Sequence, residues 1–244
     1  MRLDLYLYTN GFADSRTKAQ SIIKQSRVTV NGKTADKVSL EISETDTVTV
    51  SESADFEFVG RGGNKLEHTF SVFDYSAQGK ICVDIGASTG GFTQCLLLHG
   101  AEKVYAVDSG TNQLSPKLVN DSRVISMEGF NARNLTKSDI DGNEAQLVVM
   151  DVSFISQKLL YPAVLAVSAK GADVITLIKP QFEAGKKALG KHGVVKDEKT
   201  RQLVVDDIIR YATDMGFEYV GHCVSPITGG DGNVEYLLHL KVKS

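Results

Sequence analysis

A glycine-rich segment from Asp84 to Phe92, DIGASTGGF, has the composition of a loop that holds a ligand. It follows a short apolar stretch typical of a buried strand, and its glycines let the backbone turn tightly and approach a ligand closely. It is not the dinucleotide-binding G-x-G-x-x-G, because Ser88 replaces the second glycine, nor a P-loop, because Phe92 replaces the lysine. Without those pyrophosphate contacts, the segment is expected to bind a smaller ligand with a charged amino-acid end.

A second acidic residue follows the next predicted strand. Asp108 stands 22 residues after Gly86, a position from which a carboxylate can accept hydrogen bonds from both hydroxyls of an adenosine ribose. A D-x-G-x-x-x-G loop followed by a strand-terminal acid is typical of S-adenosylmethionine sites. The loop alone would also suit an ordinary turn in any doubly wound protein, so the prediction depends on the loop, the acid and the strand order together.

Four further charged residues stand beside apolar segments. Asp151 and Lys179 each end a predicted strand, Lys65 lies near the start of a predicted helix, and Glu235 begins the last predicted strand. Each by itself could be a rim charge or a surface salt bridge, but open α/β sheets bind ligands at the rim where strands end. A lysine there could deprotonate or polarise a ribose hydroxyl, a second cation would lower its pKa, and carboxylates would orient both ammonium groups.

Other methyl-transfer chemistries fit the sequence less well. No Asn/Asp-Pro-Pro-aromatic motif of the exocyclic-amine enzymes follows the fourth body strand, and no cysteine follows Pro or Thr as in the cytosine-carbon enzymes. The three cysteines, Cys82, Cys95 and Cys223, cannot all pair and have no C-x-x-C spacing. They predict reduced thiols in the cytoplasm, with neither a disulfide framework nor a metal site.

Strands alternate with helices in the part of the chain that carries these residues. We expect strands at 81–85, 104–108, 124–127, 147–151, 173–179, 217–224 and 234–242, and helices at 65–73, 91–98, 156–168 and 197–215. This alternation predicts a doubly wound, mostly parallel, seven-stranded Rossmann-like α/β sheet with helices on both faces. No helix separates the last two strands, which predicts an antiparallel strand at that edge.

The first 50 residues predict a small separate α+β domain. Two helices precede VTVNGK at 28–33, where Asn-Gly indicates a two-residue hairpin, and TVTV at 47–50 supplies a further strand. Residues 1–37 carry seven Lys and Arg against three Asp, a net charge of +4 in a chain whose total is −3. A basic head on an acidic body favours contact with a polyanion, and a solvated helix face explains the charge equally well.

Length and composition exclude several classes of protein. The chain has 244 residues, of which 42% are hydrophobic and 23% charged, an ordinary balance for a folded protein with one large and one small domain. The opening MRLDLYLYTN has no apolar core of a signal peptide, and no stretch approaches the roughly 18 apolar residues of a membrane span. We therefore expect a cytoplasmic protein without a membrane segment.

The motifs together resemble the bacterial hemolysin A-like family of ribosomal RNA methyltransferases over nearly the full length. The body is similar to the FtsJ-like ribose 2′-O-methyltransferases, and the head to the RNA-binding domain of the ribosomal protein S-four type. The motifs are GRGGNKL at 60–66, DIGASTGGFT at 84–93, DVSFIS at 151–156, IKPQFE at 178–183, GVV at 193–195, and SP to GNVE between 225 and 235.

This resemblance implies a fold, a cofactor, a substrate and site residues. It implies an RNA-binding domain at 1–50, a linker at 51–60 and an S-adenosylmethionine-dependent methyltransferase domain at 61–244, acting on cytidine 2′-hydroxyls of ribosomal RNA or a ribosomal subunit. The catalytic residues would be Lys65, Asp151, Lys179 and Glu235. The cofactor contacts would be Asp84, Gly86, Ala87, Ser88, Gly91, Phe92, Asp108 and Asn131. We expect RNA contacts from Arg2, Arg16, Lys18, Lys24, Arg27, Asn31 and Lys33.

Two alternative functions stay open at this point. The family name raises a secreted pore-forming hemolysin or cytotoxin, although the sequence has no signal peptide, long amphipathic hairpin or membrane span. A non-catalytic RNA-binding protein could also keep the methyltransferase fold, although all four implied catalytic residues are present. The sequence leaves the target nucleotide, the ribosomal subunit and the oligomeric state undetermined.

Overall fold

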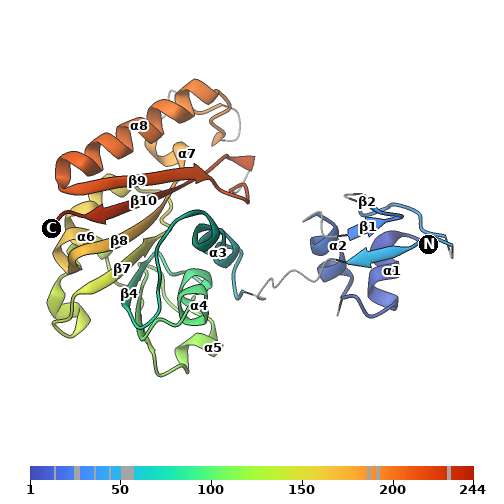
Figure 1. Ribbon diagram of the computed structural model, residues 1–244, viewed down its shortest axis with the longest axis horizontal. Helices are drawn as coiled ribbons and strands as arrows, with labels where there is room; N and C mark the ends of the chain where they lie inside the picture. Colours follow the sequence, from blue (N-terminus) through green and yellow to red (C-terminus); the bar gives the residue numbers. More distant parts are fainter. Residues whose placement is uncertain are drawn as a thin grey trace. The chain divides into compact units, whose positions relative to one another are not determined.

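Seven strands form one sheet in the order β6-β5-β4-β7-β8-β10-β9 (Figure 1). The computed structural model describes residues 1–13, 15–24, 28–35, 37–43, 45–50, 58–185, 188–190, 193–229 and 232–244. The strands are β4 (Ile81–Ile85), β5 (Lys103–Val107), β6 (Val124–Met127), β7 (Ala145–Met150), β8 (Ser168–Ile178), β9 (Phe217–Val224) and β10 (Tyr236–Val242). The strands β6, β5, β4, β7 and β8 pair in parallel, and β10 pairs antiparallel with both β8 and β9. The predicted doubly wound, mostly parallel sheet is confirmed, with its antiparallel strand β10 inserted between β8 and the outermost strand β9.

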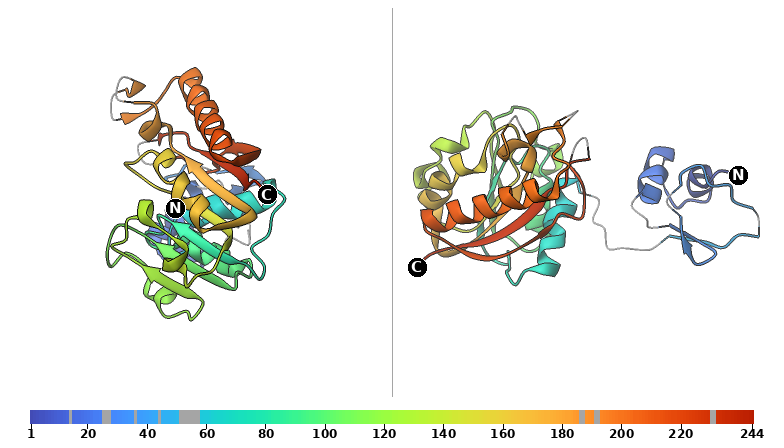
Figure 2. Two further views of the ribbon diagram at one scale, coloured as in Figure 1. Left: turned by 90° about the vertical axis from the view of Figure 1, so that its left-hand side faces the viewer. Right: turned by 90° about the horizontal axis from the view of Figure 1, so that it is seen from above.

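Helices cover both faces of this sheet, as predicted. The principal ones are α3 (Gly62–Val72), α4 (Gly91–Leu98), α6 (Tyr161–Val167) and α8 (Glu198–Met215), and the short ones are α5 (Pro116–Val119), α7 (Pro180–Glu183) and the 3₁₀ helices η1 (Ala132–Asn134), η2 (Lys137–Ile140) and η3 (Gln157–Leu159). Figure 2 shows α8 running along β9. Successive side chains of a strand point to opposite faces, so Val148 and Met150 of β7 pack with α6 and α8, while Leu147 and Val149 pack with α3 and α4.

Several predicted boundaries differ from the structure. The single helix predicted at 156–168 is divided into η3 and α6, because Pro162 stands in the first turn of α6 and favours a new helix start there. Strand β8 begins at Ser168 rather than 173, because Ser168 pairs with Ala145 of β7 beyond a register shift between Ala145 and Leu147. Helix α3 begins at Gly62 rather than at Lys65, since two glycines do not indicate a helix start.

The N-terminal segment forms its own small unit. It contains α1 (Leu3–Thr9), α2 (Arg16–Lys24) and a three-stranded antiparallel sheet of β2 (Lys33–Thr34), β1 (Val28–Val30) and β3 (Val48–Val50), in that order. The predicted hairpin is confirmed. Asn31 and Gly32 have φ angles of 52° and 75°, as a two-residue turn between twisted strands requires. A separate core of this unit includes Leu3, Leu7 and Ile23.

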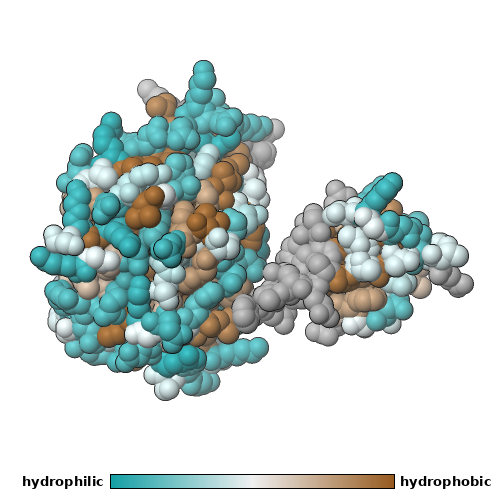
Figure 3. All heavy atoms as spheres, in the orientation of Figure 1, coloured by the Kyte–Doolittle hydropathy of each residue, from teal (hydrophilic) through white to brown (hydrophobic). Residues whose placement is uncertain are grey.

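The chain divides into two compact units, Met1–Phe56 and Glu57–Ser244. Most of the predicted linker, residues 51–57, lies outside the described residues. Its last residues belong to the second unit, because Phe58 and Val59 pack against the core that α3 and α4 share. The visible face in Figure 3 is mostly hydrophilic, with hydrophobic side chains scattered among the polar ones. Among the described residues, no helix is both long enough and apolar enough to cross a membrane.

Candidate functional site

Four charged side chains meet in one cavity at the carboxyl ends of β4, β7 and β8. They are Lys65, Asp151, Lys179 and Glu235, which we call the charged quartet. The cavity has a volume of about 270 Å³, and its other walls are Gly60–Gly62, Gly86–Thr89, Gly91, Phe92 and Ile227–Gly229. Because β10 is antiparallel and its Tyr236 pairs with Ile178 at the end of β8, Glu235 arrives at the same rim as the strand ends. The structure thus brings the four residues together as expected.

The quartet is a chain of alternating charges. The Lys65 ammonium lies 2.6 Å from Glu235 Oε2 and 4.0 Å from Asp151 Oδ2. The Lys179 ammonium lies 2.5 Å from Asp151 Oδ1 and donates a hydrogen bond of 2.8 Å to Ser153 Oγ. Asp151 is therefore placed between two cations. Two positive and two negative charges offset one another, which reduces the cost of burying each of them.

Three glycines allow close packing at the quartet and in the helix that carries Lys65. Gly86 has φ of +86°, and a Cβ there would lie 2.4 Å from the Asp151 carbonyl oxygen. A Cβ on Gly229 would lie 2.2 Å from Glu235 Oε1, and one on Gly63 would lie 2.1 Å from the Phe58 ring. These separations are shorter than any nonbonded carbon contact, so a side chain at any of the three would displace part of the site.

A second cavity of about 370 Å³ adjoins the first at Gly86, Ser88 and Asp151. Its apolar walls include Ile85, Val107, Phe130 and Leu160, and its polar residues include Asp108, Gln113 and Asn131. The Asp108 carboxylate accepts backbone hydrogen bonds from Ser88 at 2.8 Å and from Gly110 at 2.7 Å. Each carboxylate oxygen has a second acceptor position, so Asp108 fixes the loop and still faces the cavity. Apolar walls with a carboxylate at Asp108 suit a nucleoside.

The structure places the predicted cofactor residues around these two cavities, with one exception. Gly86, Ala87, Ser88, Gly91 and Phe92 line the first cavity, and Gly86, Ser88, Asp108 and Asn131 line the second. Asp84 lines neither, because its carboxyl is fully buried and accepts a 2.6 Å hydrogen bond from Thr93 Oγ1. Burial raises the pKa of Asp84 to about 7. Asp84 joins β4 to α4 behind the glycine-rich loop, so it would hold this loop in place without touching a ligand.

Sequence reasoning missed the residue that shapes the loop beside the second cavity. The Glu128 carboxylate accepts backbone hydrogen bonds from Asn112, Gln113 and Leu114, at 2.9, 2.6 and 3.0 Å. These bonds, led by that from Leu114, hold the pKa of Glu128 below its usual value. The fold of this loop places Gln113 in the cavity wall. No local sequence signal marks Glu128, since it acts on a loop more than ten residues away.

Phe154 is a second residue that sequence reasoning did not single out. Its side chain is 91% exposed although it lines the second cavity, and its backbone has φ of +63°. Bulky residues rarely adopt that conformation, which is found where the surrounding structure enforces it. The Phe182 ring supports it in a tilted contact with a 5.0 Å centroid separation. Phe154 thus presents an aromatic face at the second cavity, and the residue before it, Ser153, accepts the hydrogen bond from Lys179.

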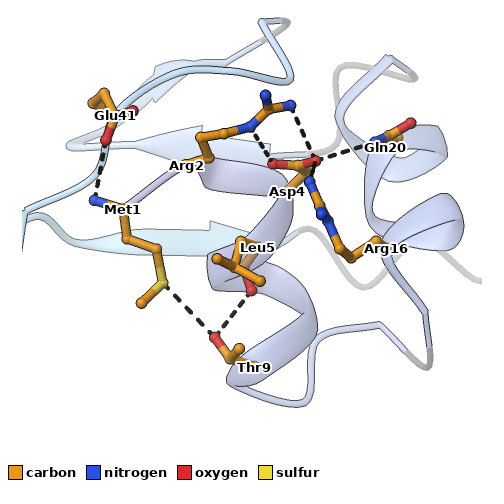
Figure 4. A network of polar contacts seen from close by, with 8 residues as sticks. All are labelled: Met1, Arg2, Asp4, Leu5, Thr9, Arg16, Gln20 and Glu41. Carbon is orange, nitrogen blue, oxygen red and sulfur yellow. Dashed lines mark hydrogen bonds and ion pairs between the residues drawn. The ribbon is translucent and has the colours of Figure 1, made fainter.

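In the N-terminal unit, a buried carboxylate organises two of the predicted RNA-binding arginines (Figure 4). Asp4 is fully buried and accepts hydrogen bonds from Arg2 Nε at 3.0 Å, Arg16 Nη2 at 2.9 Å and Gln20 Nε2 at 3.1 Å. The Arg2 hydrogen bond is the main reason that the pKa of Asp4 lies far below its ordinary value. The arginine side chains remain 45% and 49% exposed, so Asp4 fixes two cations that still face solvent.

The other predicted RNA contacts divide into four cases. Lys33 is exposed on β2. Asn31 uses its side chain within the turn, donating to Asp46 Oδ1 at 2.7 Å and accepting from the Thr47 amide at 2.9 Å. Lys18 and Lys24 lie on α2, and Arg27 lies outside the described residues.

Comparisons with known proteins identify both units. The model of the FtsJ-like methyltransferase family matches residues 58–242, and the S4 domain model matches residues 1–48. Hemolysin A of Brachyspira hyodysenteriae is 44% identical over 98% of this chain and 99% of its own length. The 16S/23S rRNA (cytidine-2′-O)-methyltransferase TlyA of Mycobacterium tuberculosis is 41% identical over 100% of this chain and 90% of its own. A solved structure named as a hemolysin, from Streptococcus thermophilus, has a TM-score of 0.77 and 39% identity, covering 100% of this chain and 89% of its own.

Proposed function

This chain belongs to the FtsJ-like methyltransferase family, and we propose that it transfers a methyl group from S-adenosylmethionine to a ribose 2′-hydroxyl of ribosomal RNA. The observation that carries the proposal is the charged quartet, which opens onto a nucleoside-sized cavity at Gly86 and Asp151. When bound, S-adenosylmethionine supplies an activated methyl carbon. We further propose cytidine in a ribosomal subunit as the target, because TlyA of Mycobacterium tuberculosis is named for that reaction on 16S and 23S rRNA.

The two cavities fit the two ends of this cofactor. Asp108 would accept hydrogen bonds from the ribose hydroxyls, and the walls formed by Ile85, Val107 and Phe130 would enclose the adenine. The loop from Gly86 to Ser88 borders both cavities and would follow the chain that joins ribose to amino acid. The reactive carbon would then lie toward Asp151, which, like this loop, borders both cavities.

The quartet would prepare the 2′-hydroxyl for attack. We assign proton removal to Lys179, because its nitrogen lies at the cavity wall, where Asp151 and Ser153 hold it in place. The 2′-oxygen would form its bond to the methyl carbon as its proton passes to the Lys179 nitrogen, and the carbon–sulfur bond of the cofactor would break, so that S-adenosylhomocysteine leaves. Lys65 lies between Asp151 and Glu235, at 4.0 and 2.6 Å, and would hold both carboxylates in place. Holding the reacting groups in line supplies much of the rate.

The direct test is methyl transfer by the purified full-length protein. With labelled S-adenosylmethionine and ribosomal subunits that lack the modification, we expect label on one or a few cytidine 2′-oxygens, located by mass mapping. Label on a base would overturn the ribose assignment, and absence of both cofactor binding and label would favour a non-catalytic RNA-binding protein. Lysis of red cells by the lipid-free protein, without methyl transfer, would instead support the hemolysin function.

Asp108→Ala is expected to weaken S-adenosylmethionine binding by about 1.5–3 kcal/mol, or about 10- to 150-fold, because charged hydrogen bonds to the ribose are lost. Isothermal titration calorimetry measures this directly. Asp206→Ala is the control, since Asp206 is exposed on α8 and bonds only to Gln202 in the described residues. Equal affinities for the two variants would place the ribose contact elsewhere.

Phe154→Ala is expected to lower kcat/KM for RNA by about 5- to 150-fold. Cofactor affinity should change little, because a ring that is 91% exposed covers little of the second cavity. The exposed ring offers a stacking surface for a base, and one such stack contributes about 1–3 kcal/mol. Tyr219→Ala, which removes a part-exposed aromatic from β9, is the matched control. A loss of cofactor affinity in Phe154→Ala would show that the ring serves the cofactor cavity and not RNA.

Deletion of residues 1–50 is expected to leave cofactor binding intact and to flatten the salt dependence of RNA binding. The N-terminal unit has its own core, so its loss does not open the core of the second unit. Each phosphate contact contributes about 0.7–0.9 to the slope of log affinity against log salt concentration, and Arg2 and Arg16 are fixed at the surface to make two. An unchanged slope would exclude electrostatic RNA contact by this unit.

A further inference from the structure

Outside the charged quartet, three potential metal ligands converge between α3 and α4, which lie side by side in Figure 1. Glu67 lies on α3 and Cys95 on α4, and His99 is the residue that caps the carboxyl end of α4. One ligand atom of each lies within 4.8 Å of the other two. Glu67 Oε2 lies 2.8 Å from His99 Nε2 and accepts a 3.5 Å hydrogen bond from Cys95 Sγ.

The arrangement has the features of a transition-metal site. Cys95 and His99 are four residues apart, so they share one face of α4, and Glu67 meets them from the facing helix. Cys95 is fully buried, while the side chains of Glu67 and His99 are 35% and 30% exposed. The thiol therefore forms the floor of a site that solvent reaches through the other two ligands. The His99 ring stacks on Phe70 with a 3.7 Å centroid separation, which fixes its orientation.

We propose that Glu67, Cys95 and His99 bind a zinc ion that links α3 to α4. One thiolate, one imidazole and one carboxylate are the ligand types that zinc takes, and three protein ligands leave a fourth tetrahedral position for water. Zinc bond lengths of about 2.0–2.3 Å place ligand atoms about 3.5 Å apart. The ligand atoms lie within 4.8 Å of one another, with Glu67 Oε2 2.8 Å from His99 Nε2, so each separation needs to change by about 1.3 Å at most. On binding, the Cys95 thiol loses its proton to solvent.

The proposed ion would brace the helices that carry the site. Lys65 lies two residues before Glu67 on α3, and α4 begins with Gly91 and Phe92 at the wall of the quartet cavity. The sequence predicted no metal site, because only the Cys95–His99 spacing is visible in it. The third ligand comes from a helix that reaches α4 only in the folded chain.

The test titrates untagged, metal-free, full-length protein with Co²⁺ as a spectroscopic probe and then with Zn²⁺. We expect one equivalent of cobalt to bind with the charge-transfer absorption of a cobalt–thiolate bond, and zinc to displace it. Cys95→Ser, His99→Gln and Glu67→Gln are each expected to weaken zinc binding at least about tenfold, since loss of even an outer-shell partner weakens metal binding by 10- to 100-fold. Cys95→Ser is expected to abolish the charge-transfer band.

Two control variants separate this site from adventitious binding. His68→Gln alters the residue next to Glu67, whereas Cys223→Ser removes the part-exposed thiol of β9. Both variants are expected to bind zinc with the affinity of the unaltered protein. If circular dichroism shows that Cys95→Ser does not fold, the zinc affinity of His99→Gln tests the proposal, because the His99 side chain is partly exposed and its replacement disturbs the core less. Cobalt binding without a thiolate band, or unchanged zinc affinity in His99→Gln, would overturn the proposal.

Discussion

Lys179→Arg is expected to bind S-adenosylmethionine and RNA normally and to transfer the methyl group about 10²- to 10⁴-fold more slowly. That is the usual contribution of a positioned acid or base. Arginine keeps the positive charge beside Asp151 but does not give up its proton in proteins. It can polarise the 2′-oxygen but cannot remove its proton. A guanidinium would keep the ion pair that Lys179 makes with Asp151 Oδ1 at 2.5 Å. The variant therefore removes the ability to accept a proton and leaves the positive charge in place.

Single-turnover rates with saturating cofactor and RNA measure this effect without contributions from binding. Lys80→Arg is the matched control, since Lys80 also pairs with a carboxylate, Asp173, in the same domain but outside both cavities. A near-normal rate for Lys179→Arg would overturn the assignment of Lys179 as the base. A partial rate that keeps every pH step of the unaltered protein would instead assign it an electrostatic role.

Glu235→Gln is expected to reduce the free energy of unfolding by about 3–5 kcal/mol and to impair methyl transfer as well. Glu235 is only 2% exposed and accepts the 2.6 Å ion pair from Lys65. Removing one member of a buried ion pair leaves the other charge without compensation in a medium that solvates it poorly. The Asp151 carboxylate, at 4.0 Å, is already committed to Lys179. Urea unfolding followed by circular dichroism gives the change.

The double variant Lys65→Met/Glu235→Leu separates stability from catalysis. Replacing a whole buried ion pair with apolar side chains is often neutral or stabilising, so we expect the double variant to regain most of the lost stability but no activity. Glu144→Gln, which breaks the half-exposed pair with Lys137, is expected to cost at most about 1 kcal/mol. A double variant that recovers methyl transfer would show that Lys65 and Glu235 are structural only.

The sequence by itself determined the architecture, because the relevant signals are local. Alternation of apolar strands with helical segments predicted the sheet, and Asn31-Gly32 predicted the hairpin, each from preferences that act over a few residues. The charged residues Asp108, Asp151 and Lys179 were located because each directly follows the end of a strand. In a mostly parallel sheet, that position alone fixes the rim at which a side chain lies.

Tertiary structure decided the contacts between elements. Lys65 and Glu235 are 170 residues apart in the chain, and only the antiparallel insertion of β10 beside β8 brings them to 2.6 Å. The same dependence on packing buries Asp84 against Thr93 and away from both cavities, and joins Glu67 to the ligands on α4. Residue type and spacing describe one element at a time. Which side chains touch across elements depends on how the helices and strands pack, and that packing is fixed only in the folded chain.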